Sequence, residues 1–238
     1  MIYNSNCLEV LKSLENKVDL ICTDPPYHVT SRGNCGTMGG FWKNTNSKKG
    51  KIFEHNDIEV SDYAQLFYEV LKDNCHCYVM CNNKNLIDFL NEFTKVGFKF
   101  VKSLIWDKRN KICSRYYMYC FEYILMFTKG ERSINFPSTP DILSIPIKKL
   151  KNADGSNQHD CEKPIELMKI LIKNSTQKGE TVLDPFMGIG STCVASKMLE
   201  RDYIGIEIDP KYFKIAEERL STLSKTMHQE VAEVGTTL

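Results

Sequence analysis

One stretch decides how this sequence folds: VDLICTDPPY, residues 18–27. Its apolar start, Val18–Cys22, has the length and composition of a buried strand. Two consecutive prolines follow, and they fix φ near about −65° and stiffen the backbone directly after that strand. In open α/β sheets, ligands bind in the crevice at the carboxyl ends of the strands. Asp24 and Tyr27 are therefore candidates for a functional site.

Around this stretch, short apolar runs alternate with helical patterns, which is typical of an α/β sheet fold. Helical spacing of apolar residues predicts crossover helices over Tyr63–Lys72 and Ile165–Lys173. The predicted strands are Met1–Tyr3, Val18–Thr23, His76–Cys81, Phe98–Trp106, Tyr123–Thr128, Thr181–Asp184 and Tyr203–Ile208.

The composition fits a single α/β domain over residues 1–238. With 238 residues, of which 42% are hydrophobic, the chain is long enough for one full core but short for two. The formal net charge is only +1, so a nucleic-acid surface must come from local clusters. Cysteines lie mostly within apolar runs and lack paired CxxC spacing, so we expect no metal site. No leader pattern and no apolar run of ~20 residues is present, so we expect a soluble, cytoplasmic protein.

A second strand leads into a glycine turn and a helix. The stretch VLDPFMGIGST, residues 182–192, predicts a turn at Gly188 and Gly190 and a helix over Ser191–Leu199. Glycines in such a turn let the backbone approach a ligand closely. Glu207 ends the next strand about 20 residues on, where a carboxylate binds ribose hydroxyls in Rossmann-like sites. This pairing indicates an adenosine-containing cofactor, and a plain surface charge at Glu207 is the alternative interpretation.

The tetrapeptide after the first strand suits chemistry on the amino group of a nucleobase. Such a group is a poor nucleophile because its lone pair is delocalised into the ring. Asp24 can accept one of its N–H groups and the carbonyl of Pro25 the other, while Tyr27 can stack on a base extruded from the duplex. The alternative interpretation is a stiff turn without chemistry. The candidate catalytic residues are therefore Asp24, Pro25, Pro26 and Tyr27.

Taken together, the two motifs resemble those of the beta group of DNA amino-methyltransferases, known from bacterial restriction–modification systems and phages. In that family the Asp-Pro-Pro-Tyr motif precedes the glycine motif, as Asp24–Tyr27 does here. The similarity covers most of the chain, including Lys163-Pro164 and Asp209–Leu220. Ser5-Asn6 stands where the family usually has Gly-Asp, and residues 159–162 depart from its usual pattern.

The resemblance implies a Rossmann-like, S-adenosylmethionine-dependent fold, with a mostly parallel sheet, helices on both faces and a circularly permuted motif order. It also implies in-line transfer of the sulfonium methyl group without a covalent enzyme intermediate. Asp184 would neighbour the methionyl part of the cofactor, Phe186 would lie beside it and Glu207 would bind its ribose. The implied cofactor-binding residues are Asn6, Cys7, Lys163, Asp184, Pro185, Phe186, Gly188, Gly190, Ser191, Thr192, Glu207 and Ile208.

Double-stranded DNA is the partner that the resemblance implies, and a homodimer and a cognate restriction endonuclease are further partners that it suggests. Residues 28–56 predict a mobile loop that closes over the flipped base, with a disordered excursion as the alternative. Residues 130–158 lie where the family reads its target and predict a short recognition segment. The candidate DNA-binding residues are Arg32, Lys43, Lys48, Lys49, Lys108, Arg109, Lys148 and Lys149.

The predicted activity is site-specific methylation of the exocyclic N6 amino group of adenine in DNA. The closest alternative is the N4 amino group of cytosine, for which this family often has serine in place of Asp24. RNA and protein-glutamine methyltransferases are further alternatives, but the chains of that kind have the glycine motif first. A non-catalytic DNA-binding relative is the last alternative, which the intact Asp24 and Tyr27 disfavour.

Overall fold

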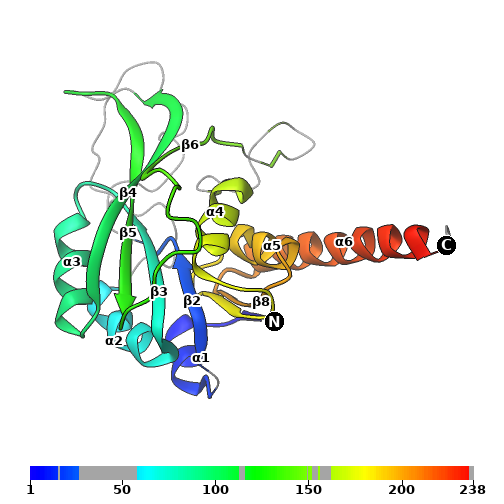
Figure 1. Cartoon of the computed structure of the whole chain (residues 1–238), viewed down its shortest axis with the longest axis horizontal. Coiled ribbons are helices and arrows are strands. Elements are labelled where there is room, and N and C mark those ends of the chain that lie inside the picture. Colours follow the sequence, from blue (N-terminus) through cyan, green and yellow to red (C-terminus); the bar gives the residue numbers. More distant parts are fainter. Residues whose placement is uncertain are drawn as a thin grey trace.

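The computed structural model of the chain describes residues 1–15, 17–26, 58–112, 116–148, 150–151, 155 and 162–235. It contains an eight-stranded sheet in the order β1-β8-β7-β2-β3-β5-β4-β6 (Figure 1). The strands are β1 Ile2–Asn4, β2 Val18–Thr23, β3 Leu71–Cys81, β4 Lys99–Ile112, β5 Tyr119–Lys129, β6 Ile142–Ser144, β7 Thr181–Asp184 and β8 Asp202–Glu207. The helices are α1 Cys7–Ser13, α2 Val60–Val70, α3 Leu86–Lys95, α4 Ile165–Ser175, α5 Ser191–Met198 and α6 Pro210–Gly235.

Strand β2 lies inside the sheet, and all of its residues are buried. It pairs in parallel with β7 on one side, where Ile21 lies opposite Leu183, and with β3 on the other, where Ile21 lies opposite Cys77. A strand covered by helices on both faces needs apolar residues on both, which is why the run around Ile21 does not alternate. Only β3–β5 and β4–β5 pair antiparallel among the described strands. The prediction of a mostly parallel sheet is confirmed.

The chain order of the strands is permuted relative to their positions in the sheet. The N-terminal strand β1 pairs with β8, the last strand of the chain, and Tyr3 lies opposite Ile206. The strand that carries the Asp24 motif, β2, is likewise a neighbour of β7, which carries the glycine motif. The predicted permuted architecture therefore brings two segments about 160 residues apart to one edge of the sheet.

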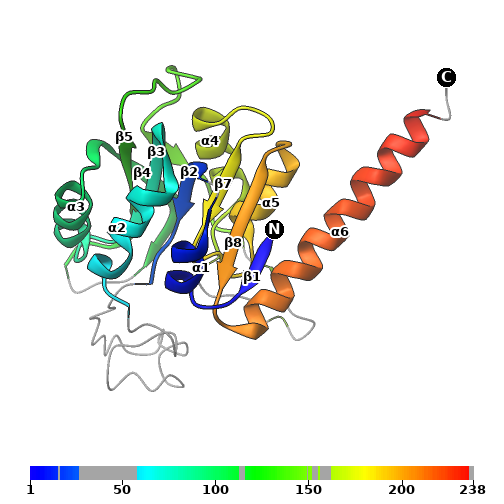
Figure 2. The same cartoon turned by 90° about the horizontal axis from the view of Figure 1, so that it is seen from below.

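Helices cover both faces of the sheet (Figure 2). Helices α1, α2 and α3 lie on one face, over a buried cluster that includes Phe67 and Phe93. Helices α4 and α5 lie on the other face, over a cluster that includes Leu20 and Met168. Helix α6 begins beside α5 and then runs away from the sheet (Figures 1 and 2). None of the described helices has the length and apolar character to cross a membrane.

The sequence patterns do not predict helices α1 and α3 or strand β6, which are short or mostly polar. Helix α3 buries only Phe89 and Phe93, which is too few apolar positions for a clear period. Strand β6 has three residues, of which only Leu143 is buried, and it extends the sheet beside β4. It belongs to the segment 130–158, so part of that segment is a strand of the sheet. Helix α1 is only seven residues long.

The predicted helix Tyr63–Lys72 extends too far. Helix α2 ends at Val70, and Leu71 already pairs with Val18 as the first residue of β3. Pairing in the sheet overrides the helical spacing at this boundary. Some predicted features lie outside the described residues altogether, so their roles stay predictions. These are the loop 28–56 with Arg32, Lys43, Lys48 and Lys49, together with Tyr27 and Lys149.

Gly205 in β8 has no room for a side chain. A Cβ atom there would lie 2.4 Å from Met187 Sδ and 2.6 Å from Cys193 Sγ, and both of those side chains are buried. We expect Gly205→Ala to lower the free energy of unfolding by about 1–3 kcal/mol, the usual cost of overpacking a core. Denaturant titration measures this change. Adding Cys193→Ala removes one contact and recovers part of the loss, whereas a Gly205→Ala protein as stable as the wild type would contradict this packing.

Candidate active site

The candidate site lies where the carboxyl ends of β2 and β7 meet. Thr23 ends β2 and Asp184 ends β7, and both side chains are buried. The Thr23 hydroxyl donates a 2.6 Å hydrogen bond to Asp184 Oδ1. Asp24 is the next residue after Thr23, and the glycine turn follows Asp184. The structure therefore brings the two sequence motifs to a common edge, where α/β sheets bind ligands.

Asp24 has one oxygen bound and one oxygen open. Its Oδ2 accepts a short hydrogen bond from Lys163 Nζ, and the two groups form an ion pair. Its Oδ1 is buried and accepts no hydrogen bond from any residue that the structure describes. A buried acceptor without a donor is costly by about 1–3 kcal/mol. The open oxygen therefore marks a place where the donor of a ligand would be stabilising.

A row of alternating charges leads from Asp24 to the strands β4 and β5. Lys163 Nζ lies 3.5 Å from Glu122 Oε2, and Glu122 Oε1 accepts a short hydrogen bond from Lys108. The side chains of Lys163, Glu122 and Lys108 are 9%, 17% and 14% exposed. Both ammonium groups lie near the Trp106 ring, at 6.0 Å and 5.1 Å from its centroid. Two ammonium groups thus balance two carboxylates in a mostly buried cluster, which we call the charge cluster.

The charge cluster sets the ionisation of Asp24. Burial raises the pKa of the Asp24 carboxyl, and Lys163 opposes that rise. Burial acts in the same direction on Glu122, but Lys163 and Lys108 hold the pKa of Glu122 below its ordinary value. The negative charge of Glu122 in turn raises the pKa of Asp24. Lys163 is therefore the group that favours the ionised, hydrogen-bond-accepting form of Asp24.

The glycine turn is fixed to Glu207. Gly188 has a φ of 53°, in the left-handed region that glycine adopts readily. Its N–H donates to Glu207 Oε2 at 2.9 Å, and the N–H of Asp209 donates to Oε1 at 2.8 Å. Each carboxylate oxygen has a further acceptor site, so Glu207 can still accept from two hydroxyl groups. Burial raises the pKa of this carboxyl. The arrangement is compatible with the predicted contact to a ribose.

Helix α6 holds the turn from the other side. Gly190 has a φ of 80°, and a Cβ atom there would lie 3.0 Å from Ala216 Cβ in α6. This glycine therefore allows close packing against a helix, and its predicted close approach to a ligand stays a prediction. Arg219 of α6 donates a 2.7 Å hydrogen bond to the carbonyl of Ile189 and pairs with buried Glu162 at 3.2 Å. Arg219 lies in the family-like stretch Asp209–Leu220, but sequence reasoning gave it no role in the site, because its partners Ile189 and Glu162 are distant in the sequence.

Asp184 is a buried carboxyl that lacks a cation. It is 4% exposed, and its Oδ1 accepts a 3.1 Å hydrogen bond from the N–H of Phe186 in addition to that from Thr23. Among the described residues, no lysine or arginine forms an ion pair with it. Burial raises the pKa of Asp184 to about 6. A positively charged ligand beside it would favour the ionised form.

Tyr63 of α2 is a second residue that sequence reasoning missed. It is fully buried, and its ring meets that of Phe186 edge-on at 5.3 Å between centroids. Its hydroxyl has no hydrogen-bond partner among the described residues. Buried hydroxyls are normally satisfied, so this one is available to a ligand or a water molecule. The only signal in the sequence was helical spacing, which indicates a core position and no more.

The remaining predicted cofactor residues divide between capping, core and exposed positions. Asn6 caps α1, since its Oδ1 accepts the N–H of Leu8 at 2.9 Å. Cys7 belongs to the core, where burial raises the pKa of its thiol to about 12. Ile208 follows Glu207 and is 42% exposed. Three residues of the turn and of the start of α5 are buried: Pro185, Ser191 and Thr192.

The described candidates for DNA binding have different surroundings. Lys108 is bound to Glu122 inside the charge cluster, a contact that clustering of basic residues in the sequence did not reveal. Arg109 and Lys148 are exposed. Phosphate contacts by these three residues stay predictions.

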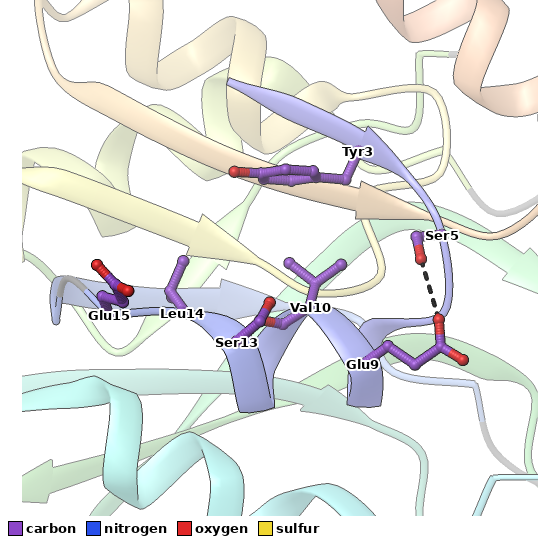
Figure 3. Close-up of a pocket in the computed structure, with 7 residues that line it drawn as sticks. All are labelled: Tyr3, Ser5, Glu9, Val10, Ser13, Leu14 and Glu15. Atoms are coloured by element: carbon purple, nitrogen blue, oxygen red, sulfur yellow. Dashed lines mark hydrogen bonds between the residues drawn. The ribbon is translucent and has the colours of Figure 1, made fainter.

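A hollow of about 420 Å³ lies between β1 and α1 (Figure 3). Two of its lining residues interact: the Ser5 hydroxyl donates a 3.4 Å hydrogen bond to Glu9 Oε2. None of the predicted catalytic or cofactor-binding residues lines it, so it carries no assignment. Its lining residues are Tyr3, Ser5, Glu9, Val10, Ser13, Leu14 and Glu15.

Comparison with known proteins agrees with this fold and identifies the family of the chain. A family model described as DNA methylase matches residues 18–218, and the chain belongs to that family. It is similar to the putative methylase YubD of Escherichia coli K12, with 30% identity over 95% of this chain and 92% of that protein. It is also similar to the type II methyltransferase M2.MboI of Moraxella bovis, with 26% identity over 96% and 90% of the two chains.

Solved structures show the same relationship. The crystal structure of M1.HpyAVI matches with a TM-score of 0.70 at 25% identity, over 92% of this chain and 98% of that one. A structure of M1.HpyAVI in complex with S-adenosylmethionine matches with a TM-score of 0.67. The resemblance to the DNA amino-methyltransferases that the sequence motifs indicated is confirmed.

Replacing Lys163 tests its hold on Asp24. Lys163→Met removes the charge that opposes the rise in the Asp24 pKa, so the pKa rises further. Activity that needs an ionised Asp24 is lost below that pKa, so we expect the acidic limb of the rate–pH profile to move to higher pH. Lys169→Met is the matched control, because Lys169 lies in α4, six residues after Lys163, and pairs with Glu166.

Cofactor affinity separates this role from the predicted cofactor contact of Lys163. Replacing a positioning residue leaves the dissociation constant for S-adenosylmethionine nearly unchanged, whereas replacing a residue that binds the cofactor raises it. An acidic limb in the same position as in the wild type would contradict the positioning role.

Proposed function

We propose that this chain transfers a methyl group from S-adenosylmethionine to the N6 amino group of an adenine flipped out of duplex DNA. One observation carries the proposal: among the residues that the structure describes, none donates a hydrogen bond to the buried Oδ1 of Asp24, while Lys163 binds Oδ2. This oxygen lies at the edge of the sheet that Asp24 shares with the glycine turn. A carboxylate oxygen in this state favours an N–H donor. The membership in the DNA methylase family supports a nucleobase as that donor.

S-adenosylmethionine is the cofactor, and it supplies a methyl group made electrophilic by the neighbouring sulfonium. Two carboxyls of this chain fit it, a buried one at Asp184 and a half-buried one at Glu207. Asp184 lacks a cation of its own and suits the positively charged part, and Glu207 retains acceptor sites for ribose hydroxyls. Gly188 leaves the backbone of the turn free of a side chain beside Glu207. Burial raises the pKa values of Asp184 and Glu207, and a positively charged or hydrogen-bonding ligand would stabilise their ionised forms.

The residues of this chain orient the amino group rather than attack it. One amino N–H donates to Asp24 Oδ1 and the second donates to the carbonyl of Pro25, so that the nitrogen lone pair faces the methyl carbon. The new N–C bond forms while the S–C bond breaks and its electron pair stays on sulfur. The nitrogen then loses a proton, for which Asp24 is the nearest acceptor. Lys163 keeps that carboxylate ionised and restrains its rotation by holding Oδ2.

Adenine is proposed over cytosine because of Asp24. In the family that this chain resembles, cytosine enzymes often have serine at this position. The fold itself does not discriminate, since the cytosine-N4-specific PvuII methyltransferase matches with a TM-score of 0.71 at 17% identity. The type II relatives support a role in restriction–modification in the bacterial or phage-infected cytoplasm. The proposal also includes a cognate endonuclease, a homodimer, and recognition of the target sequence by residues 130–158.

Identifying the methylated base tests this proposal. The wild type and Asp24→Ala are incubated with labelled S-adenosylmethionine and unmethylated duplex DNA, and the nucleosides are then separated by mass. We expect N6-methyladenine, with the rate lowered by about 100-fold or more in Asp24→Ala. The control is Asp202→Asn, which should leave the rate unchanged. Asp202 begins β8, at the end of the strand opposite Glu207. N4-methylcytosine would move the activity to the alternative base, and no transfer to DNA would refute the proposal.

The pH dependence of cofactor binding tests the role of Asp184. Because burial raises its pKa to about 6, the carboxyl is ionised above that pH and becomes neutral below it. A cationic ligand prefers the ionised form, so we expect the dissociation constant for S-adenosylmethionine to rise by about tenfold per pH unit below pH 6. Calorimetric titration of the wild type and Asp184→Asn measures it. The variant binds weakly with a flat profile, and an equally steep profile in the variant would exclude Asp184.

A further inference from the structure

The hairpin of β4 and β5 extends beyond the rest of the sheet. Residues Tyr123–Thr128 of β5 pair with both β3 and β4, whereas the segment Tyr119–Glu122 pairs with β4 alone. Strand β3 ends at Cys81, opposite Tyr123. The part of the hairpin that does not pair with β3 therefore extends beyond the carboxyl ends of β2 and β3, as Figure 1 shows. That is the same edge at which Asp24 lies.

The base of this hairpin is part of the charge cluster. Glu122 of β5 and Lys108 of β4 bind each other, and Lys163 links them to Asp24. The hairpin thus has a fixed position relative to the catalytic carboxylate.

The tip of the hairpin exposes four large side chains in a row. Tyr116, Tyr117, Met118 and Tyr119 are 82%, 92%, 59% and 51% exposed. Single exposed apolar residues are normal on a protein surface, but a contiguous group of aromatic residues marks a binding surface. Tyrosine offers an apolar face and a polar hydroxyl, which suits a partner that presents both stacked rings and polar edges.

Positive charge lies beside these rings. The β4 strand is bulged here, because Asp107 lies opposite Phe121 while Ile112 already lies opposite Tyr119. Within the bulge, Arg109 has a left-handed φ of 56°, and both Arg109 and Lys111 are exposed. A residue other than glycine held in this conformation needs support from its surroundings.

One acidic residue of the hairpin, Asp107, offsets part of this charge, because it interacts with Arg109. Asp107 accepts the N–H of Arg109 at 3.0 Å and the hydroxyl of Ser144 at 2.8 Å, which holds the bulge in place. Glu122 is engaged by Lys108 inside the charge cluster. With Arg109 and Lys111 against Asp107, the described surface of the tip is aromatic and carries a net positive charge.

We propose that the hairpin tip, defined here as residues 116–119 with Arg109 and Lys111, is a DNA-contacting surface that stacks on bases next to the flipped one. The inference rests on duplex DNA as the substrate. Aromatic rings interleaved with cations match the stacked bases and phosphates of a nucleic acid. Tyr117 lies five residues from Glu122, at most ~17 Å along a strand, which spans about five base steps of a duplex. The tip therefore reaches the flanks of a base held at Asp24.

The test compares DNA affinity with and without the rings. The affinity of a fluorescent random-sequence duplex is measured by anisotropy, with S-adenosylhomocysteine present, for the wild type and for the double variant Tyr117→Ala, Met118→Ala. We expect binding weakened by about tenfold or more, the loss typical of a removed base-stacking ring. Tyr117→Phe keeps the ring and stays close to the wild type. Ile87→Ala, which removes a 66% exposed side chain from α3, is the matched control with unchanged affinity.

Two further outcomes keep the inference separate from its alternatives. Unchanged DNA affinity in the double variant overturns it, and a simultaneous change from dimer to monomer in sedimentation would assign the tip to a second copy of the chain. Binding of the duplex does not require methyl transfer. If the double variant loses DNA affinity while the wild type forms no methyladenine, the DNA-contacting surface stands and the proposed activity fails.

Discussion

The pairing of β2 with β7 is the constraint on which the site depends. It joins segments about 160 residues apart, and the hydrogen bond from Thr23 to Asp184 closes it at the carboxyl edge. Everything that follows in the two segments then shares one crevice: Asp24 from the first, and the glycine turn from the second. A shift of one residue in this pairing would exchange the faces of every side chain along β2. The continuous burial of β2 on both faces makes such a shift unfavourable.

Within this frame, two aspartates at neighbouring strand ends acquire different properties from their surroundings. Asp24 has Lys163 beside it, and that ammonium opposes the effect of burial on its pKa. Asp184 has only hydrogen-bond donors, so burial raises its pKa to about 6. Placing carboxyls of unlike pKa side by side is a common way to divide tasks in an active site. Here the paired carboxylate suits an amino group, and the unpaired one suits a cation.

The sequence predicts the parts of this site that are local. The strand before Asp24 and the turn at Gly188 are each encoded within about ten residues, so pattern and turn chemistry suffice to find them. The ion pair of Lys163 with Asp24 spans 139 positions of the chain, and no local pattern encodes it. Lys108 illustrates the same limit, because a group of basic residues in a sequence does not show which of them meets a buried carboxylate. Arg219 was missed for this reason as well.

The fold shows the same division between local and non-local information. Strand β2 was predicted with its observed bounds because its apolar run is continuous, whereas β6 exists through its pairing with β4 and has one buried residue. The boundary between α2 and β3 depends on the contact of Leu71 with Val18, which helical spacing does not contain. The packing of Gly190 against Ala216 was not predicted either, because Ala216 belongs to a helix late in the chain.

The most direct test of the central claim is a crystal structure of the chain with a non-transferable analogue of S-adenosylmethionine and a duplex that contains its methylation site. The account predicts that the target amino nitrogen lies about 2.7–3.2 Å from Asp24 Oδ1, while Lys163 remains on Oδ2. An amino group bound elsewhere, or an Asp24 whose Oδ1 faces water with the base in place, would contradict it.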